Sequence, residues 1–198
     1  MMRFFALLIL MLPLAAQAGD ASKGETIAGK ICMACHGTEG TSPLPANPNI
    51  AGQHEAYILK QLRDYRSGAR ENAIMAGMIA GLSDDDMRNV AAFYASRNPS
   101  RLAATDKDRA AAGRRLYRGG DLEKGIAACS GCHSPSGAGI PKQYPRIAGQ
   151  HAEYTTAQLM AFRSGQRAND ENEMMRIIAS RLSDQEIAAL AEYLSGLH

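Results

Sequence analysis

The sequence predicts an all-α protein that contains two copies of one domain. Many residues recur at a constant offset of 97, as Cys32 recurs at Cys129. Apolar residues between positions 55 and 67 are spaced three or four apart, as on one face of a helix. The alternation of apolar and polar residues that is typical of strands is absent. A chain of 198 residues also suits two small domains better than one.

The first 18 residues predict a secretory signal peptide. Arg3 precedes an apolar run at 4–12, and Ala16-Gln17-Ala18 is typical of a cleavage site. The run is shorter than the roughly 20 residues that a membrane helix needs. We therefore expect an exported chain that begins at Gly19; the alternative is an uncleaved membrane anchor. No later segment is apolar for long enough to cross a membrane.

One pentapeptide occurs in both copies: Cys32-Met33-Ala34-Cys35-His36 and Cys129-Ser130-Gly131-Cys132-His133. In C-x-x-C-H the two thiols can form thioethers with one haem, and the adjacent imidazole can bind its iron. The sequence therefore predicts two covalently bound haems c. The thioether residues are Cys32, Cys35, Cys129 and Cys132, and the iron ligands are His36 and His133.

A structural zinc site and a thioredoxin-like redox pair are the alternatives for these cysteines. Zinc sites use paired cysteines without a histidine fixed beside each pair. A thioredoxin-like motif belongs on a βαβ pattern, which this sequence lacks. Haem attachment explains the complete repeated motif, and it agrees with export because c-type haems are attached outside the bacterial inner membrane.

Each copy is expected to contain, in order, a helix, the haem motif, a Gly/Pro-rich loop, a helix, a Met-bearing loop and a final helix. The helix at 55–67 places Ile58, Leu59, Leu62 and Tyr65 on one face. Ser83 and Ser183 are predicted N-caps of the final helices, with Asp86 and Glu186 completing capping boxes. The final helices should bury one apolar set in each copy: Val90, Phe93 and Tyr94, then Ile187, Leu190 and Leu194.

The repeat divides the chain into a signal peptide at 1–18, a domain at 19–98, a linker at 99–108 and a second domain at 109–198. The linker contains Pro99 and a run of small and charged residues. Charges nearly balance, with 22 Lys and Arg against 20 Asp and Glu and a net charge of +2. This balance is too even to indicate a nucleic-acid partner.

The sixth iron ligand decides whether such a site passes electrons or binds a substrate. After a short insertion the offset becomes 100, as Leu82 recurs at Leu182. At that offset Met75 matches Met175, which is the only position with methionine in both copies. We expect Met75 and Met175 to be the ligands. Compared with a second imidazole, a thioether ligand raises the reduction potential of the haem iron.

Two other ligand sets remain open on the sequence. Met78 and Met174 are the alternatives if the loops align differently. His54 and His151 could make bis-histidine haems, although their place at a helix start also suits a surface or interface histidine.

Four arginines and two prolines are candidates for supporting the haems. The carbonyls of Pro48 and Pro145 could accept the second N–H of the ligand histidines, or these prolines could simply shape the loops. Arginines at and just beyond the end of the second helix of each copy could pair with haem propionates, or they could be solvated: Arg66, Arg70, Arg163 and Arg167.

These residues resemble a known family, the dihaem cytochromes c4. The resemblance covers essentially the whole mature chain, with C-M-A-C-H-G and N-I-A-G-Q in the first copy and C-S-G-C-H-S-P and Y-P-R-I-A-G-Q-H in the second. It implies two class I cytochrome c domains, each with one haem c. It also implies axial methionines at Met75 and Met175 and a Pro48 carbonyl that accepts from His36.

The resemblance implies a periplasmic electron carrier, not an enzyme, that takes electrons from an upstream donor and delivers them to a terminal oxidase of the respiratory chain. It leaves open whether the protein stays attached to the membrane surface. Two alternatives remain. The first is the electron-accepting subunit of a larger dehydrogenase. The second is a dihaem peroxidase, which needs an iron with an open site, and two matching methionines argue against it.

Overall fold

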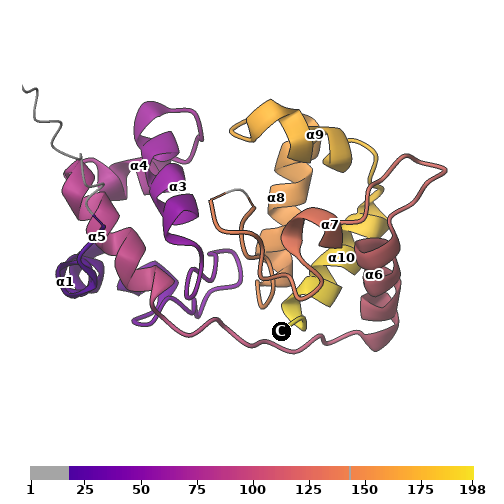
Figure 1. The fold of residues 1–198 in the computed structure, drawn as a ribbon, viewed down its shortest axis with the longest axis horizontal. Helices are drawn as coiled ribbons and strands as arrows, with labels where there is room; N and C mark the ends of the chain where they lie inside the picture. Colours follow the sequence, from indigo (N-terminus) through magenta and orange to yellow (C-terminus); the bar gives the residue numbers. More distant parts are fainter. Residues whose placement is uncertain (1–17, 143) are drawn as a thin grey trace, which may run out of the picture.

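The computed structural model describes residues 18–142 and 144–198. The predicted signal peptide, apart from Ala18, lies outside the described residues. Two groups of helices lie side by side, joined by an extended segment along one edge (Figure 1). The first group contains α1 (Ala21–Ile31), α2 (Met33–His36), α3 (Glu55–Ser67), α4 (Ala73–Ile79) and α5 (Asp84–Ala95).

The second group repeats this order. It contains α6 (Lys107–Gly119), α7 (Ser130–His133), α8 (Ala152–Ser164), the short 3₁₀ helix η1 (Glu171–Glu173), α9 (Met174–Ala179) and α10 (Asp184–Ser195). Residues 18–142 and 144–198 form no strand, only two isolated bridges, Asp121 with Ile126 and Ile140 with Tyr144. The predicted all-α pair of domains is confirmed.

The first and last helices of each domain cross at a glycine. Gly24 of α1 lies against the Asn89 carbonyl of α5, and a Cβ there would come within 2.0 Å of that oxygen. Gly113 of α6 lies against the Ala189 carbonyl of α10 with the same 2.0 Å approach. Because glycine has no side chain, the two helix backbones of each pair can pack closely. This packing fixes the position of the haem motif in each domain.

The predicted core faces are confirmed. In α3, Ile58 and Leu62 are buried, and Leu59 and Tyr65 pack against the same cluster. All of the residues expected to be buried in the final helices are buried: Val90, Phe93, Tyr94, Ile187, Leu190 and Leu194. Both predicted capping boxes are present, with Ser83 and Asp86 starting α5 and Ser183 and Glu186 starting α10.

Two expectations about local structure need correction. The methionine-bearing segments are short helices, not loops, because Asn72 caps α4 by accepting from the Met75 N–H at 2.9 Å. In the second copy the insertion is accommodated by Asn172 and Glu173, which both have positive φ, immediately before α9. The linker is also shorter than expected, since α6 already begins at Lys107 and is capped by Asp106.

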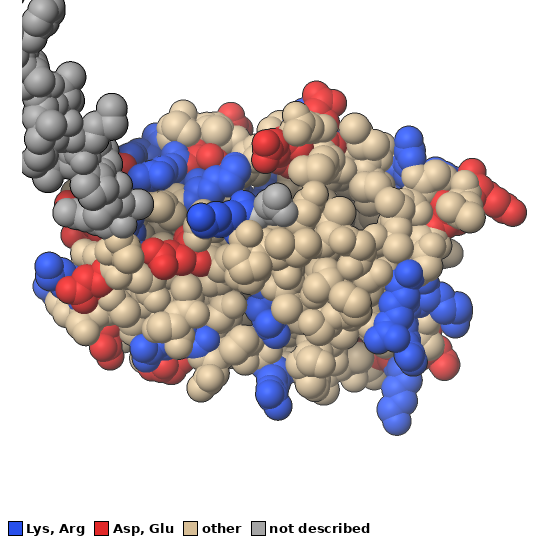
Figure 2. All heavy atoms as spheres, in the orientation of Figure 1, with Lys and Arg blue, Asp and Glu red and all other residues tan. Residues whose placement is uncertain are grey.

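The surface carries charges of both signs. Figure 2 shows acidic and basic side chains interspersed over one face, with a basic group over α6. Arg114, Arg115 and Arg118 of this helix line a shallow depression. Within residues 18–142 and 144–198, no helix has the length and apolar character needed to span a bilayer.

Candidate haem sites

The two predicted ligand histidines occupy equivalent places at the ends of the one-turn helices α2 and α7. Each is buried, His36 at 8 % and His133 at 6 % exposure. His36 Nδ1 lies 3.0 Å from the Pro48 carbonyl oxygen, and His133 Nδ1 lies 3.0 Å from that of Pro145. A carbonyl only accepts, so Nδ1 carries the proton and Nε2 keeps the lone pair that an iron needs. The hydrogen bonds predicted for both prolines are present.

The environment keeps both imidazoles neutral. Burial lowers the pKa of His36 and of His133, and the hydrogen bonds to the proline carbonyls oppose that effect only in part. A neutral imidazole with its Nδ1 proton fixed is the form that binds a metal.

The cysteines lie within the same helical turn, with the Cys35 N–H donating to the Cys32 carbonyl and the Cys132 N–H to the Cys129 carbonyl, both at 3.2 Å. Burial raises the pKa of Cys32 and of Cys129 to about 11. A thioredoxin-like pair requires a lowered thiol pKa. The described part of the chain also holds no cluster of three or more His, Cys, Asp or Glu side chains that could bind a metal ion. The raised pKa of these thiols therefore argues against a thioredoxin-like pair.

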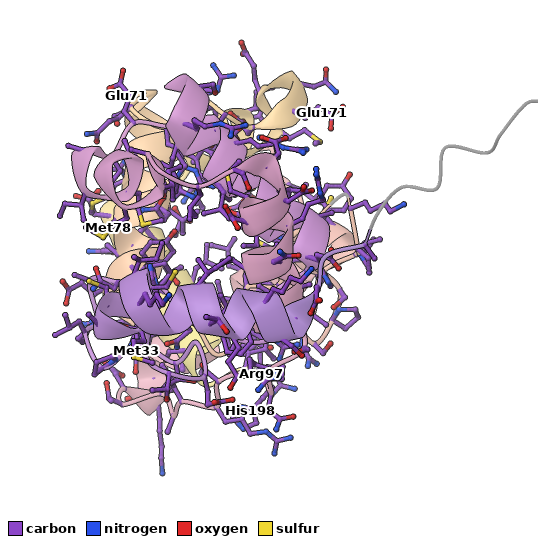
Figure 3. All side chains as sticks on the ribbon, turned by 90° about the vertical axis from the view of Figure 1, so that its left-hand side faces the viewer. Met33, Glu71, Met78, Arg97, Glu171 and His198 are labelled. Atoms are coloured by element: carbon purple, nitrogen blue, oxygen red, sulfur yellow. The ribbon has the colours of Figure 1, made fainter. Side chains whose placement is uncertain are left out.

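The methionine candidates for the sixth iron ligand differ in how deeply they are buried. Met75 is half-buried and packs against the same core cluster as Cys32, whereas Met78 is 48 % exposed. Met175 is half-buried, and Met174 is 38 % exposed. In Figure 3 the labelled Met33, which follows Cys32, and Met78 lie toward the same side of the first domain.

Two of the four candidate arginines are buried at the boundary between the domains. Arg70 donates to Gln61 of its own domain and to Tyr154 and Gln158 of the other, at 2.7–2.9 Å. Arg167 makes the matching bonds, to Gln158 within its domain and to Tyr57 and Gln61 across the boundary, at 2.8–3.1 Å. Each of these two arginines is only 8 % exposed.

The partners of Arg70 and Arg167 are all neutral, and among the described residues neither arginine forms an ion pair with a carboxylate. A buried charge without a counter-charge costs several kcal/mol, on the order of the penalty for an unpaired ion. Haem propionates would supply the missing negative charge. The residues present therefore fit two haems c.

The other two arginines and both helix-start histidines have different roles. Arg66 pairs with Asp84, and Arg163 pairs with Asp184 at 2.6 Å, so neither is free for a propionate. His151 Nε2 donates to the Ser42 carbonyl across the domain boundary at 3.0 Å, which makes it an interface residue. The equivalent His54 Nε2 is buried and has no hydrogen-bond partner among residues 18–142 and 144–198.

Six further polar side chains, whose role is not predicted from the sequence, hold the boundary: Gln53, Tyr57, Gln61, Gln150, Tyr154 and Gln158. All of them recur at the offset of 97. That recurrence was the available signal, because repeated polar residues on a helix face often mark a shared contact.

Comparison with known proteins assigns both domains to one family. The cytochrome c family matches residues 21–97 and 110–198. A protein named cytochrome c4 from Azotobacter vinelandii is 45 % identical over 196 residues, which is 93 % of this chain and 92 % of the relative. The chain belongs to the dihaem cytochrome c4 family. The crystal structure of reduced recombinant cytochrome c4 from Pseudomonas stutzeri matches with a TM-score of 0.88 and 43 % identity, over 91 % of this chain and 100 % of that one.

A second kind of relative has a more specific name. A thiosulfate dehydrogenase electron acceptor from Stutzerimonas stutzeri (strain A1501) is 41 % identical over 196 residues, which is 95 % of this chain and 91 % of the relative. Membership of the cytochrome c4 family means that the protein carries two covalently bound haems c. It transfers electrons and is not an enzyme.

Proposed function

We propose that this protein is a periplasmic electron carrier that takes electrons from an upstream donor and delivers them to a terminal oxidase. Cys32, Cys35, Cys129 and Cys132 hold the haems, and the iron ligands are His36 with Met75 and His133 with Met175. The observation that carries this assignment is the equivalence of the two sites. Each has a buried histidine fixed by a proline carbonyl and a half-buried methionine on the following short helix.

The residues perform three tasks in this function. The proline carbonyls fix the imidazole rings and increase their basicity. The methionines close the sixth position, which excludes substrate and raises the reduction potential. The haem supplies the one-electron couple, and the protein keeps the site rigid so that little reorganisation accompanies each transfer.

Visible spectra of the mature holoprotein, with haem quantified per chain, test the assignment. We expect two low-spin haems, the weak far-red band of methionine-ligated ferric iron and no reaction of the reduced protein with carbon monoxide. A single haem per chain, or a carbon monoxide shift in half of the sites, would contradict closed ligation in both domains.

A second candidate function is the electron-accepting partner of a dehydrogenase, for which the relative named thiosulfate dehydrogenase electron acceptor is the support. Stopped-flow mixing distinguishes the two functions. The oxidised protein is mixed with a thiosulfate dehydrogenase and thiosulfate, and the reduced protein is mixed with a terminal oxidase. Rapid reoxidation by the oxidase alone supports the first function, and rapid reduction by the dehydrogenase supports the second.

The proposed location follows from the predicted signal peptide. Osmotic release of the periplasm should yield a protein that begins at Gly19. Release only after a high-salt wash of the membranes would indicate peripheral attachment, whereas retention of the apolar run at 4–12 would show an uncleaved anchor.

A further inference from the structure

Each domain reaches across the boundary with one glutamine and binds the backbone of the other domain at both of its polar groups. Gln150 Oε1 accepts from the Asn49 N–H, and Gln150 Nε2 donates to the Asn49 carbonyl, both at 2.9 Å. Gln53 Oε1 accepts from the Arg146 N–H at 2.9 Å, and Gln53 Nε2 donates to the Arg146 carbonyl at 2.8 Å. We call these two contacts the glutamine clamps.

The clamped N–H groups belong to the peptides that also bind the ligand histidines. The Pro48 carbonyl, which accepts from His36 at 3.0 Å, and the Asn49 N–H, which donates to Gln150, are the two ends of one peptide group. The Pro145 carbonyl and the Arg146 N–H likewise belong to one peptide group, between His133 and Gln53. A continuous line of two hydrogen bonds and one peptide thus joins each ligand histidine to the opposite domain.

Such a line transmits polarisation. The peptide group is delocalised, so a hydrogen bond that its N–H donates increases the negative charge on its carbonyl oxygen. That oxygen then accepts more strongly from the histidine Nδ1–H. A stronger bond at Nδ1 makes the imidazole a more basic ligand, which stabilises ferric iron and lowers the reduction potential.

The clamps are held firmly enough to act in this way. Gln53 is 8 % exposed, and its Oε1 also accepts from the N–H of His54 at 2.9 Å, at the start of α3. Gln150 Oε1 accepts from the N–H of His151 at 3.0 Å, at the start of α8. Each amide oxygen is therefore fixed by its own domain while it polarises a peptide of the other.

We propose that Gln150 lowers the potential of the N-terminal haem and Gln53 that of the C-terminal haem, each acting as a positioning residue across the domain boundary. This proposal rests on the assignment of His36 and His133 as iron ligands. It predicts a crossed pattern, because the residue and the haem that it affects lie in different domains.

The test compares Gln150→Met and Gln53→Met, which keep the length of the side chain and remove its polar groups. Asn169→Ala is the matched control, since its cross-domain hydrogen bonds go to Gln61 and Asp64 rather than to either peptide. Both potentials are measured by spectroelectrochemical titration of the holoprotein. The Nδ1–H signals of His36 and His133 are followed by NMR in the reduced, diamagnetic protein.

For Gln150→Met we expect the reduction equilibrium constant of the N-terminal haem to rise about twofold to threefold, or about 18–28 mV for a one-electron couple. The His36 Nδ1–H signal should move upfield, while His133 and the C-terminal haem stay unchanged. Gln53→Met should give the reverse pattern, and Asn169→Ala should change neither. Equal shifts of both haems in each variant, or a shift of the haem in the variant's own domain, would overturn the proposal.

Gln150→Glu provides a conservative rescue and a substitute if the methionine variant does not fold. It keeps an acceptor for the Asn49 N–H, so the His36 Nδ1–H signal should stay in place or move downfield; an upfield shift would contradict the proposal. Failure of the ligand assignment is recognised separately. In that case the His36 and His133 rings of the unmutated protein would lack the ring-current shifts of imidazoles bound to haem iron.

Discussion

Each proposed iron site combines a fixed ligand with a movable one. His36 is buried and has its ring orientation set by the Pro48 carbonyl. Met75 has a flexible side chain on a short helix and is held by packing against the core cluster. A thioether also binds iron more weakly than an imidazole does. The methionine side is therefore where a substitution should open the site while the haem stays attached.

Met75→Ala should leave the haem covalently bound and make the N-terminal iron reactive toward carbon monoxide, because the sixth position becomes vacant. The far-red band should fall by about half, since the other domain keeps its methionine. Met78→Ala is the matched control, because Met78 is 48 % exposed and should leave both signals intact. Carbon monoxide titration of the reduced protein measures the effect. If Met78→Ala weakened the far-red band and Met75→Ala did not, the alignment of the two copies that pairs Met75 with Met175 would be wrong.

The helices of each domain depend on close contacts that only glycine allows. Gly24 and Gly113 permit the crossings of α1 with α5 and of α6 with α10. These crossings set the position of the haem motif, which follows α1 directly in the first domain. Glycine within a helix normally costs about 1 kcal/mol relative to alanine, so here close packing outweighs intrinsic helix propensity.

Gly24→Ala should therefore destabilise the holoprotein although it increases helix propensity. The new Cβ would meet the Asn89 carbonyl oxygen at 2.0 Å, and relieving such overlap costs about 1–3 kcal/mol. Gly29→Ala on the same helix is the control, because its Cβ would meet only the end of Met33 at 3.7 Å. Thermal unfolding should show a lower Tm for Gly24→Ala and an unchanged or higher Tm for Gly29→Ala. Equal Tm values for both variants would contradict this account of the crossing.

The start of α6 is attached to α10 by one buried carboxylate. Glu192 Oε1 accepts from the Asp106 N–H at 2.7 Å, from the Thr105 hydroxyl at 2.9 Å and from the Thr105 N–H. Burial alone would raise the pKa of Glu192, but these hydrogen bonds outweigh it and hold the pKa below the ordinary value. The equivalent position in the first domain is Ala92, so this attachment is specific to the second domain.

This lowered pKa predicts an acid-dependent loss of stability. The contribution of Glu192 is fully present above the ordinary value of 4.5 and is lost as the pH falls through the lower pKa of the folded state. Glu192→Gln should lower stability at pH 7 by about 1 kcal/mol, because a charged acceptor becomes neutral. It should also reduce the difference in Tm between pH 7 and pH 3.5. An unchanged pH dependence in Glu192→Gln would contradict the assignment.

Local and repeated features were predictable from the sequence, and features of the domain boundary were not. The capping boxes at Ser83 and Ser183 depend on neighbouring residues and were predicted correctly. Nothing local distinguishes Arg66 from Arg70, yet Arg66 pairs with Asp84 at the surface while Arg70 is buried against the other domain. That difference depends on how the two domains pack together, which no periodicity within one copy encodes.

On the scale of the whole molecule, the internal repeat produces an interface in which equivalent residues of the two domains make equivalent contacts with the opposite domain. Arg70 binds Tyr154 and Gln158, and the equivalent Arg167 binds Tyr57 and Gln61. The same exchange holds for the glutamine clamps. Such reciprocity is typical of a two-fold dimer interface, here formed within one chain. We therefore expect the two domains to unfold together.

The double variant Arg70→Met with Arg167→Met should uncouple the domains. Each arginine donates to buried or partly buried neutral partners across the boundary, and leaving a buried group without its hydrogen bond typically costs about 1–3 kcal/mol. We therefore expect calorimetry of the holoprotein to show a lower Tm and two separate transitions, whereas we expect the unmutated protein to unfold in a single transition. Arg66→Met with Arg163→Met is the control. It removes two surface arginines whose pairs lie within a domain and are worth about 0–1 kcal/mol each, so the single transition should remain. If the first double variant still unfolded in one transition at an unchanged temperature, the arginines would not be what joins the domains, and the coupling would have to come from the glutamine clamps and the linker alone.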